Sequence, residues 1–461
     1  MKQLTTKLGE QKISKLLINL SVPATIGMMV NALYNLVDTI FVGRGVGALA
    51  IGGLTIAFPI QMVIMAFAQM IGIGAASAIS RSLGAKDIEK ADYIAGNSFL
   101  LIIILSSIIA AIGLTFTEPM LRLFGATDTI LPYAKDYITI ILWGSIFFSF
   151  AMSSNNLIRA EGNAKVAMAT MLIGAILNII LDPIFIFVFK MGVKGAALAT
   201  VISKFVSFLY VLIYLYSGKS SLKVKLHHLK PKMHIIIEIL TVGSATFARM
   251  VTGSVVAIVV NNSLRIFGGD MAIIIVGILQ RVTMFIFMPL FGVVQGMQPI
   301  VGFNYGAKKL DRVKETLKLS LITTTAFASF GWLIIELFPL AIISVFTRDA
   351  EIIEKGSTIM RIVISMIPLI GIQIVGAALF QSLGKAVPSL ILALLRQVLL
   401  FIPLVLILPR ILGLGLWGIW IAYPAADILS VVLTVLYLKS ELRKIDLWQT
   451  SEIKKVLTNS I

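Results

Sequence analysis

Apolar residues fill this chain in long runs that short polar segments separate. Each run is about 20 residues or longer, which suits an α-helix that crosses a bilayer and exceeds the tilted strand of a membrane barrel. We therefore predict an all-α polytopic membrane protein with twelve transmembrane helices. The predicted spans are 16–42, 53–79, 93–116, 132–158, 166–188, 194–216, 235–263, 272–302, 315–339, 356–382, 387–408 and 415–438.

The composition agrees with this pattern. Hydrophobic residues make up 58% of the 461 residues and charged residues only 13%, and the mean hydropathy is +0.98. Soluble domains carry about 25% charged residues, so these values favour a membrane protein. The chain has no cysteine, which excludes a disulfide framework and thiolate metal sites.

The net charge of +17 is distributed unevenly over the loops. If the N-terminus is cytoplasmic, the inner loops and tails hold about 24 Lys and Arg residues and the outer loops about 8. This asymmetry predicts a multi-pass protein of the plasma membrane with both termini in the cytoplasm. The basic loop 218–232 is expected to contact anionic lipid headgroups. We do not expect nucleic-acid binding.

The two halves of the chain resemble each other at a nearly constant offset of 220 to 223 residues. The related pairs are SLGAKDIEKA (82–91) with NYGAKKLDRV (304–313), LIRAEGNAKVAMATMLIGA (157–175) with LFQSLGKAVPSLILALLRQ (379–397), GVKGAALAT (192–200) with GLWGIWIAY (415–423), and LSVPAT (20–25) with LTVGSA (240–245). We predict two six-helix lobes, residues 1–217 and 233–461, joined by the cytoplasmic linker 218–232. Six is an even number, so both lobes enter the membrane in the same orientation. A pseudo-twofold axis along the membrane normal then relates them, as in two-lobed transporters.

Two carboxylates lie deep inside apolar runs of the first lobe, Asp38 and Asp182. An ionisable group at bilayer depth costs roughly 2.5–3.5 kcal/mol on insertion scales and indicates a functional site. Helical spacing places further polar residues on the same faces of spans 1, 5 and 6. These residues are Asn31, Tyr34 and Asn35 with Asp38, Asn178 with Asp182, and Thr200, Ser203, Lys204 and Ser207.

Asp38, Asp182 and Thr200 fall at similar depth in the outer half of the bilayer. Such oxygen ligands are suited to a proton or a Na⁺ ion. Binding of either removes a buried charge, which provides a switch between helix arrangements. Pro23 and Pro183 are candidate bending points, because proline frees a backbone carbonyl. The alternative is that both acids are structural and pair with Lys204 or cap hydrogen bonds.

The second lobe carries a different polar set. Arg396 and Asp427 lie at comparable depth on antiparallel spans, and we favour a structural ion pair over a role in coupling. The positions equivalent to the two acids, near Ile258 and 402–404, are apolar, so ion chemistry is expected only in the first lobe. Further polar residues are weaker candidates for the lining of a substrate cleft between the lobes. They are Arg249, Gln280, Arg281, Gln295, Gln298 and Gln373.

Signals for enzymatic chemistry are poor. The three histidines (His227, His228, His234) lie in or beside the central loop, and no phosphate-binding P-loop motif occurs. We therefore expect no catalytic residues, no cofactor and no metal site apart from a possible Na⁺ site. Transport energy would come from an ion gradient.

Over about 440 residues the chain resembles the multidrug and toxic compound extrusion (MATE) transporters. The resemblance rests on VPATIGMMVNALYNLVDTIFVG (22–43), ISRSLGAKD (79–87), IRAEGNAK (158–165), NIILDPIFIF (178–187) and GVKGAALATVIS (192–203). It implies a V-shaped bundle of twelve helices that alternates between outward- and inward-open forms. It also implies an ion site on Asp38, Asn178, Asp182 and Thr200, with Tyr34 one turn before the acid and Pro23 as a bending point. Asn155 of span 4 corresponds to a further family site residue, although its predicted depth is nearer the cytoplasm.

The resulting hypothesis is a monomeric secondary active exporter that exchanges cationic or amphipathic drugs for H⁺ or Na⁺. Other branches of the family carry acids in spans 7 and 10, and this chain lacks them. Charge pairing of a cationic drug in the second lobe is therefore not expected. The main alternative is a flippase of the same superfamily for lipid-linked oligosaccharides or polysaccharides. Arg249, Arg281 and Arg396 would then contact pyrophosphate.

Overall fold

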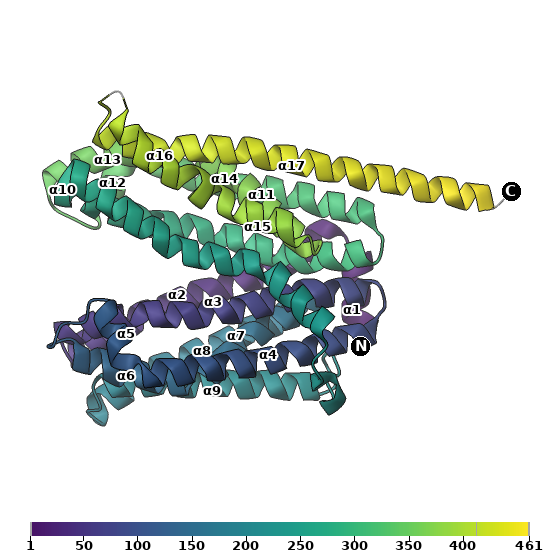
Figure 1. Ribbon diagram of the computed structural model, residues 1–461, viewed down its shortest axis with the longest axis horizontal. Coiled ribbons are helices and arrows are strands. Elements are labelled where there is room, and N and C mark those ends of the chain that lie inside the picture. The colour runs from purple at the N-terminus through teal and green to yellow at the C-terminus, as the bar shows by residue number, and fades with distance from the viewer. Residues whose placement is uncertain (1, 412, 460–461) are drawn as a thin grey trace.

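The computed structural model describes residues 2–411 and 413–459, and within them every regular element is a helix (Figure 1). The helices of the N-terminal half are α1 (Lys2–Glu10), α2 (Ile13–Gly45), α3 (Ala48–Gly84), α4 (Ile88–Thr115), α5 (Thr117–Leu123), α6 (Leu131–Trp143), α7 (Ser145–Ala160), α8 (Ala164–Pro183), η1 (Ile184–Val188) and α9 (Val193–Tyr216). After a short 3₁₀ turn, η2 (Leu226–Leu229), the C-terminal half contains α10 (Met233–Gly306), α11 (Leu310–Leu337), α12 (Pro339–Ser344), α13 (Ala350–Ile364), α14 (Ile367–Ser382), α15 (Ala386–Leu394), η3 (Leu395–Phe401), α16 (Ile402–Ile407), η4 (Leu408–Arg410) and α17 (Leu416–Asn459).

Twelve membrane spans follow from these elements, as predicted. In the described part of the chain, nine helical stretches are individually long and apolar enough to cross a bilayer. One of them, α10, holds two spans, because Gly269 breaks its helical backbone with φ 61° and ψ −158°. The pairs α6–α7 and α13–α14 are each one bent span, with bends of 58° and 44°.

The backbone repeats between the halves at the offset seen in the sequence. The α6–α7 bend lies at Gly144 and the α13–α14 bend at Met366, 222 positions later. Pro368, which follows Met366 by two residues, has no N–H to continue the preceding helix. Gly162 and Gly384 both have positive φ, 92° and 75°. The equivalent bends and turns show that the repeat is structural as well as sequential.

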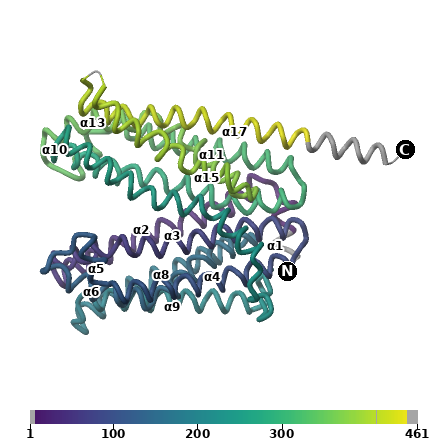
Figure 2. Tube along the Cα trace, in the orientation of Figure 1, coloured from purple at the N-terminus to yellow at the C-terminus, as the bar shows by residue number. Residues whose placement is uncertain are grey.

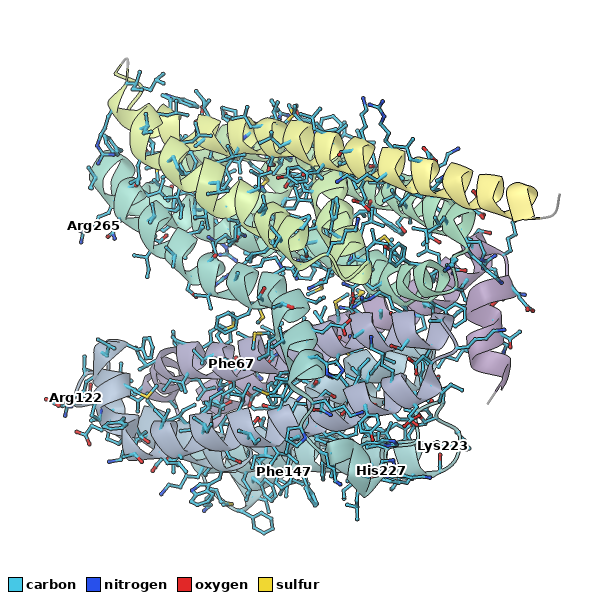
Figure 3. The ribbon with its side chains drawn as sticks, turned by 45° about the vertical axis from the view of Figure 1, so that its right-hand side comes forward. Phe67, Arg122, Phe147, Lys223, His227 and Arg265 are labelled. Carbon is cyan, nitrogen blue, oxygen red and sulfur yellow. The ribbon has the colours of Figure 1, made fainter. Side chains whose placement is uncertain are left out.

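The two six-helix lobes touch at one end and diverge at the other (Figures 1 and 2). We call these the packed end and the open end. One hydrophobic core at the packed end combines residues of both lobes, such as Ile79 and Ile300. Toward the open end each lobe has its own core, around Ile138 in the first and Trp420 in the second. Arg122 and Arg265 lie at the open end, and Lys223 lies at the packed end (Figure 3).

Glycines allow α3 and α10 to pack backbone against backbone at the packed end. A Cβ at Gly74 would lie 2.0 Å from the carbonyl oxygen of Ile239, and one at Gly243 would lie 2.0 Å from that of Met70. Backbone atoms cannot move aside as a flexible side chain would. The small-residue stretch 72–80 therefore serves close helix packing.

Polar contacts reinforce the same interface. Arg81 on α3 forms an ion pair with Glu238 on α10, with 2.9 Å between Nη2 and Oε1. The Ser77 hydroxyl donates to the carbonyl oxygen of Gln381 at 2.5 Å. These contacts bridge the lobes and must separate if the packed end opens.

Residues 218–232 are held against the first lobe. The buried carboxylate of Glu161 accepts hydrogen bonds from the Tyr214 hydroxyl at 2.6 Å, from Ser220 Oγ at 2.9 Å and from Ser221 N at 2.6 Å. Burial raises the pKa of Glu161, while these hydrogen bonds act in the opposite direction. Asn97 accepts from Lys232 N at 2.8 Å. The segment is thus anchored at both of its ends.

The N-terminal helix α1 is held by the second lobe instead. Asn304 and Arg312 both donate to the carbonyl oxygen of Leu8, at 3.0 Å and 3.2 Å. Lys309 donates to the carbonyl oxygen of Gly9 at 2.9 Å. Each lobe therefore binds a segment that leads into the other lobe.

A buried ion pair joins α17 to η3 inside the second lobe. Asp427, which is 1% exposed, pairs with Arg396, and its carbonyl oxygen accepts from Gln373 Nε2 at 3.1 Å. This agrees with the structural ion pair favoured from the sequence. Gln373 is 8% exposed and faces this pair inside the lobe, so its assignment to the substrate cleft was wrong.

Replacing Gly243 by valine should open the packed end, because the new side chain would overlap the Met70 carbonyl. The chain has no cysteine, so spin labels can be attached to Lys86→Cys and Lys308→Cys in the two equivalent loops. We expect the distance between the labels to become longer in Gly243→Val. Gly253→Val is the control, since a Cβ there meets nothing within 4 Å. Identical distance distributions in both variants would contradict the assigned role of Gly243.

Replacing Arg396 by methionine should lower the free energy of unfolding by roughly 3–5 kcal/mol, because Asp427 would keep a buried charge without a partner. The double variant Arg396→Met/Asp427→Asn should recover part of this loss. Arg361→Met is the control: it breaks the exposed pair with Glu336, and such pairs contribute about 0–1 kcal/mol. Chemical unfolding in detergent measures all three variants, and equal losses for Arg396→Met and Arg361→Met would exclude a structural role for the buried pair.

Candidate functional site

Asp38 on α2 and Asp182 on α8 meet inside the first lobe. Their side chains are 7% and 0% exposed, and the two carboxyl groups lie within hydrogen-bonding reach of each other. A hydrogen bond between two carboxyl groups needs a proton, because two ionised groups offer acceptors only. Two carboxyl groups placed in this way are chemically suited to share one proton or one small cation.

Asn178 and Thr200 complete this group. The Asn178 amide donates to Asp182 Oδ1 at 3.4 Å and to Thr200 Oγ1 at 3.3 Å. Asn178 precedes Asp182 by one turn of α8, and Thr200 reaches the site from α9. The four residues that the sequence placed on spans 1, 5 and 6 thus lie together.

Three oxygen atoms of this group have no hydrogen-bond partner in the described part of the chain. They are Asp38 Oδ1, Asp182 Oδ2 and Asn178 Oδ1, and all three are buried. Buried acceptors without partners are costly, and they are the ligands that a hard cation prefers. Two carboxylates with neutral oxygens fit a proton or Na⁺. Among the described residues no cluster of three His, Cys, Asp or Glu side chains exists that would suit a multivalent metal.

The cavity beside the carboxyl pair is lined by residues of five helices. Asp38, Tyr34, Thr200 and Lys204 belong to the predicted set. Gln61 on α3 and Tyr137 on α6 also line the cavity, and sequence reasoning missed both. Gln61 had a usable signal, since it is an isolated amide within the apolar run FPIQMVIM. Tyr137 had none, because a tyrosine near a span end is usually interfacial.

Lys204 does not neutralise either acid in this form of the protein. No ion pair links it to a carboxylate in the described residues, and its Nζ lies 4.8 Å from the centre of the Tyr34 ring. Tyr34 is buried at 7% exposure, one helical turn before Asp38. The structural alternative, in which Lys204 is paired with an acid, is therefore not the arrangement seen.

Asn155 lies apart from this group, and its assignment to the ion site was wrong. Its amide donates to the carbonyl oxygen of Ala167 at 2.5 Å. Ala167 precedes Asp182 by about four turns of α8, or roughly 22 Å along the helix axis. Asn155 instead links α7 to the beginning of α8.

The two prolines occupy different settings. Pro183 ends α8 directly after Asp182, and the π-helical segment η1 follows, with Phe189 N donating to the Ile184 carbonyl at 2.9 Å. A π-turn beside a buried acid is typical of functional sites. Pro23 lies within α2 between Ser21 and Thr25, whose side chains contact α10 at the packed end.

The remaining cleft candidates are spread over α10. Arg249 lies over the ring of Phe291 at 5.7 Å, whereas Gln280 and Arg281 are exposed. Gln295 contacts Met28 Sδ at 3.1 Å across the lobe interface, and Gln298 donates to Gln381 at 3.1 Å. Gln295 and Gln298 line a small interlobe cavity that also contains Arg159, a buried residue that sequence reasoning missed. At this interface the ring of Phe67, labelled in Figure 3, meets that of Phe247 from the other lobe. The two ring centres are 4.9 Å apart.

Known proteins resemble this chain over nearly its whole length. It is 29% identical over 424 residues to the multidrug export protein MepA of Staphylococcus haemolyticus, which covers 92% of this chain and 93% of the relative. MepA of Staphylococcus saprophyticus is 28% identical over 429 residues, covering 93% and 94%.

Solved structures share the fold. An outward-facing conformation of a MATE family multidrug resistance transporter superposes with a TM-score of 0.89 at 28% identity, covering 95% of this chain and 98% of that one. The MATE multidrug transporter DinF-BH superposes with a TM-score of 0.85 at 47% identity, covering 92% and 95%. The family model MatE matches residues 23–184 and 245–407, one segment in each lobe. The chain is therefore a multi-pass membrane protein that belongs to the MatE family of multidrug and toxic compound extrusion transporters.

Proposed function

We propose that this protein is a secondary active exporter that releases cationic or amphipathic compounds in exchange for H⁺ or Na⁺. The observation that carries the proposal is the pair Asp38–Asp182, buried among oxygen atoms that lack partners in the described part of the chain. The coupling ion would bind there. The printed names of its relatives as multidrug exporters support the substrate class.

The ion acts in this proposal by changing the charge of the first lobe. Without it, two carboxylates repel each other in a medium where charge is poorly screened. With it, α2 and α8 can stay close, and the π-turn after Pro183 offers a place for the helix to adjust. Ion binding thereby favours one of the two arrangements of the lobes, outward-open or inward-open. Coupled transport requires such a preference.

The proposed orientation places both termini and the packed end in the cytoplasm of a plasma-membrane protein. The excess of Lys and Arg in the loops at that end supports it. The open end would then face the outside, and the carboxyl pair would bind its ion from the outer side. We propose that the monomer is the working unit and that no cofactor besides the ion is needed.

The contacts of the arginines favour an exporter over a lipid-linked oligosaccharide flippase. Of the three arginines considered for pyrophosphate, Arg396 is tied to Asp427. Arg249 lies against an aromatic ring, and Arg281 is exposed. They do not form one cluster of cations.

Asp38→Asn and Asp182→Asn should each lower gradient-driven ethidium efflux by about tenfold or more, because the ion loses one of its two carboxylates. Efflux is measured in inverted vesicles with a pH gradient or a Na⁺ gradient imposed one at a time, which also identifies the ion. Asp136→Asn is the control: Asp136 lies on α6 near the open end, where it pairs with exposed Lys194 at 3.4 Å. The proposal fails if both site variants are folded in the membrane and retain full coupled efflux.

A further inference from the structure

Lys204 lies one helical turn from Thr200, which belongs to the same group as the carboxyl pair. It follows Thr200 by four residues on α9, so the two side chains share a face. It lines the same cavity as Asp38 and Tyr34. Its ammonium group lies 4.8 Å from the centre of the Tyr34 ring and 5.6 Å from that of Phe148.

Few other charges surround this ammonium group. The titratable groups facing the cavity are Tyr34 and Asp38 on α2 and Tyr137 on α6, with Asp182 behind them on α8. Gln61 on α3 and Ser145 and Phe148 on α7 are neutral. A tyrosine phenol is ordinarily neutral and adds no fixed charge. Among the described residues, the fixed charges of the site are therefore two carboxylates and one ammonium group.

We propose that Lys204 is a resident cation of the ion site and that it limits the transport cycle to one coupling ion. This inference rests on the proposed function of Asp38 and Asp182. Two ionised carboxylates and one ammonium group leave a net charge of −1, which a single H⁺ or Na⁺ cancels. Net charge inside a bilayer is costly, so the neutral lobe is the favoured one. Without the lysine, neutrality would need two monovalent cations.

The aromatic rings give Lys204 a second place to reside. Over Tyr34 and Phe148 the ammonium group is held by cation–π attraction while the carboxyl pair keeps its own proton or Na⁺. When that ion leaves, the acids need a cation, and one helical turn of about 5.4 Å is within the reach of a lysine side chain. Lys204 thus competes with the coupling ion for the same carboxylates, and this competition favours release of the ion.

The number of coupling ions can be measured from the Hill coefficient of the transport rate as a function of ion concentration. In proteoliposomes with the coupling ion titrated, efflux by the unmodified protein should have a Hill coefficient of about 1, and Lys204→Gln should raise it to about 2 with weaker apparent ion affinity. Lys204→Arg should restore a coefficient of about 1, because it restores the charge. Lys194→Gln is the matched control, since Lys194 is on the same helix but exposed and paired with Asp136.

If Lys204 had only a structural role, its replacement would change the amount of active protein but not the Hill coefficient. A Hill coefficient that stays at about 1 in the folded Lys204→Gln variant overturns the inference about Lys204. The proposed function of the carboxyl pair still stands in that case if Asp38→Asn abolishes coupling. A second measurement needs no variant. The substrate gradient that a known ion gradient can sustain gives the number of ions per cycle, and a value of about 2 for the unmodified protein would also overturn the inference.

Discussion

Charge buried within a hydrocarbon-embedded bundle must be compensated inside that bundle, and each lobe meets this constraint differently. The second lobe does so permanently, because Arg396 and Asp427 neutralise each other on neighbouring helices. The first lobe holds Asp38 and Asp182 side by side, with buried oxygens that lack partners among the described residues. Because the two lobes share one fold, this difference in charge compensation is the basis on which we propose that only the first lobe binds the coupling ion.

The two lobes can change their relative orientation because most contacts between them lie at the packed end. There one core combines residues of both halves, and glycines bring α3 and α10 into backbone contact. Elsewhere each lobe folds around its own core. A lobe with its own core can move as a unit, since the motion breaks only the shared interface. Polar contacts such as Arg81–Glu238 are suited to that interface, because partly buried ions regain hydration when they separate.

Much of this architecture was predictable from hydrophobicity alone. The number of spans and the repeat followed from apolar run lengths and a constant offset, and the grouping of Asp38, Asn178, Asp182 and Thr200 followed from helical spacing. The family resemblance, which gives no register between helices, grouped Asn155 with the acids. Its partner Ala167 lies about four turns from Asp182 along α8, in agreement with the different depth that the span assignment gave to Asn155. Gln373 was misplaced because spacing does not tell which neighbour a polar face meets. Contacts made across helices, such as Lys204 over Tyr34, are invisible in a single sequence.

The crossed attachments of the chain have a mechanical consequence. Glu161 and Asn97 make residues 218–232 part of the first lobe, while Asn304 and Arg312 make α1 part of the second. Only residues 11 and 12 separate α1 from α2, and α10 begins directly after Lys232. Both of these tethers lie at the packed end (Figures 1 and 3), so the lobes can turn about this end at lower cost than they can slide past each other. The connectivity of the chain therefore favours rotation of one lobe against the other.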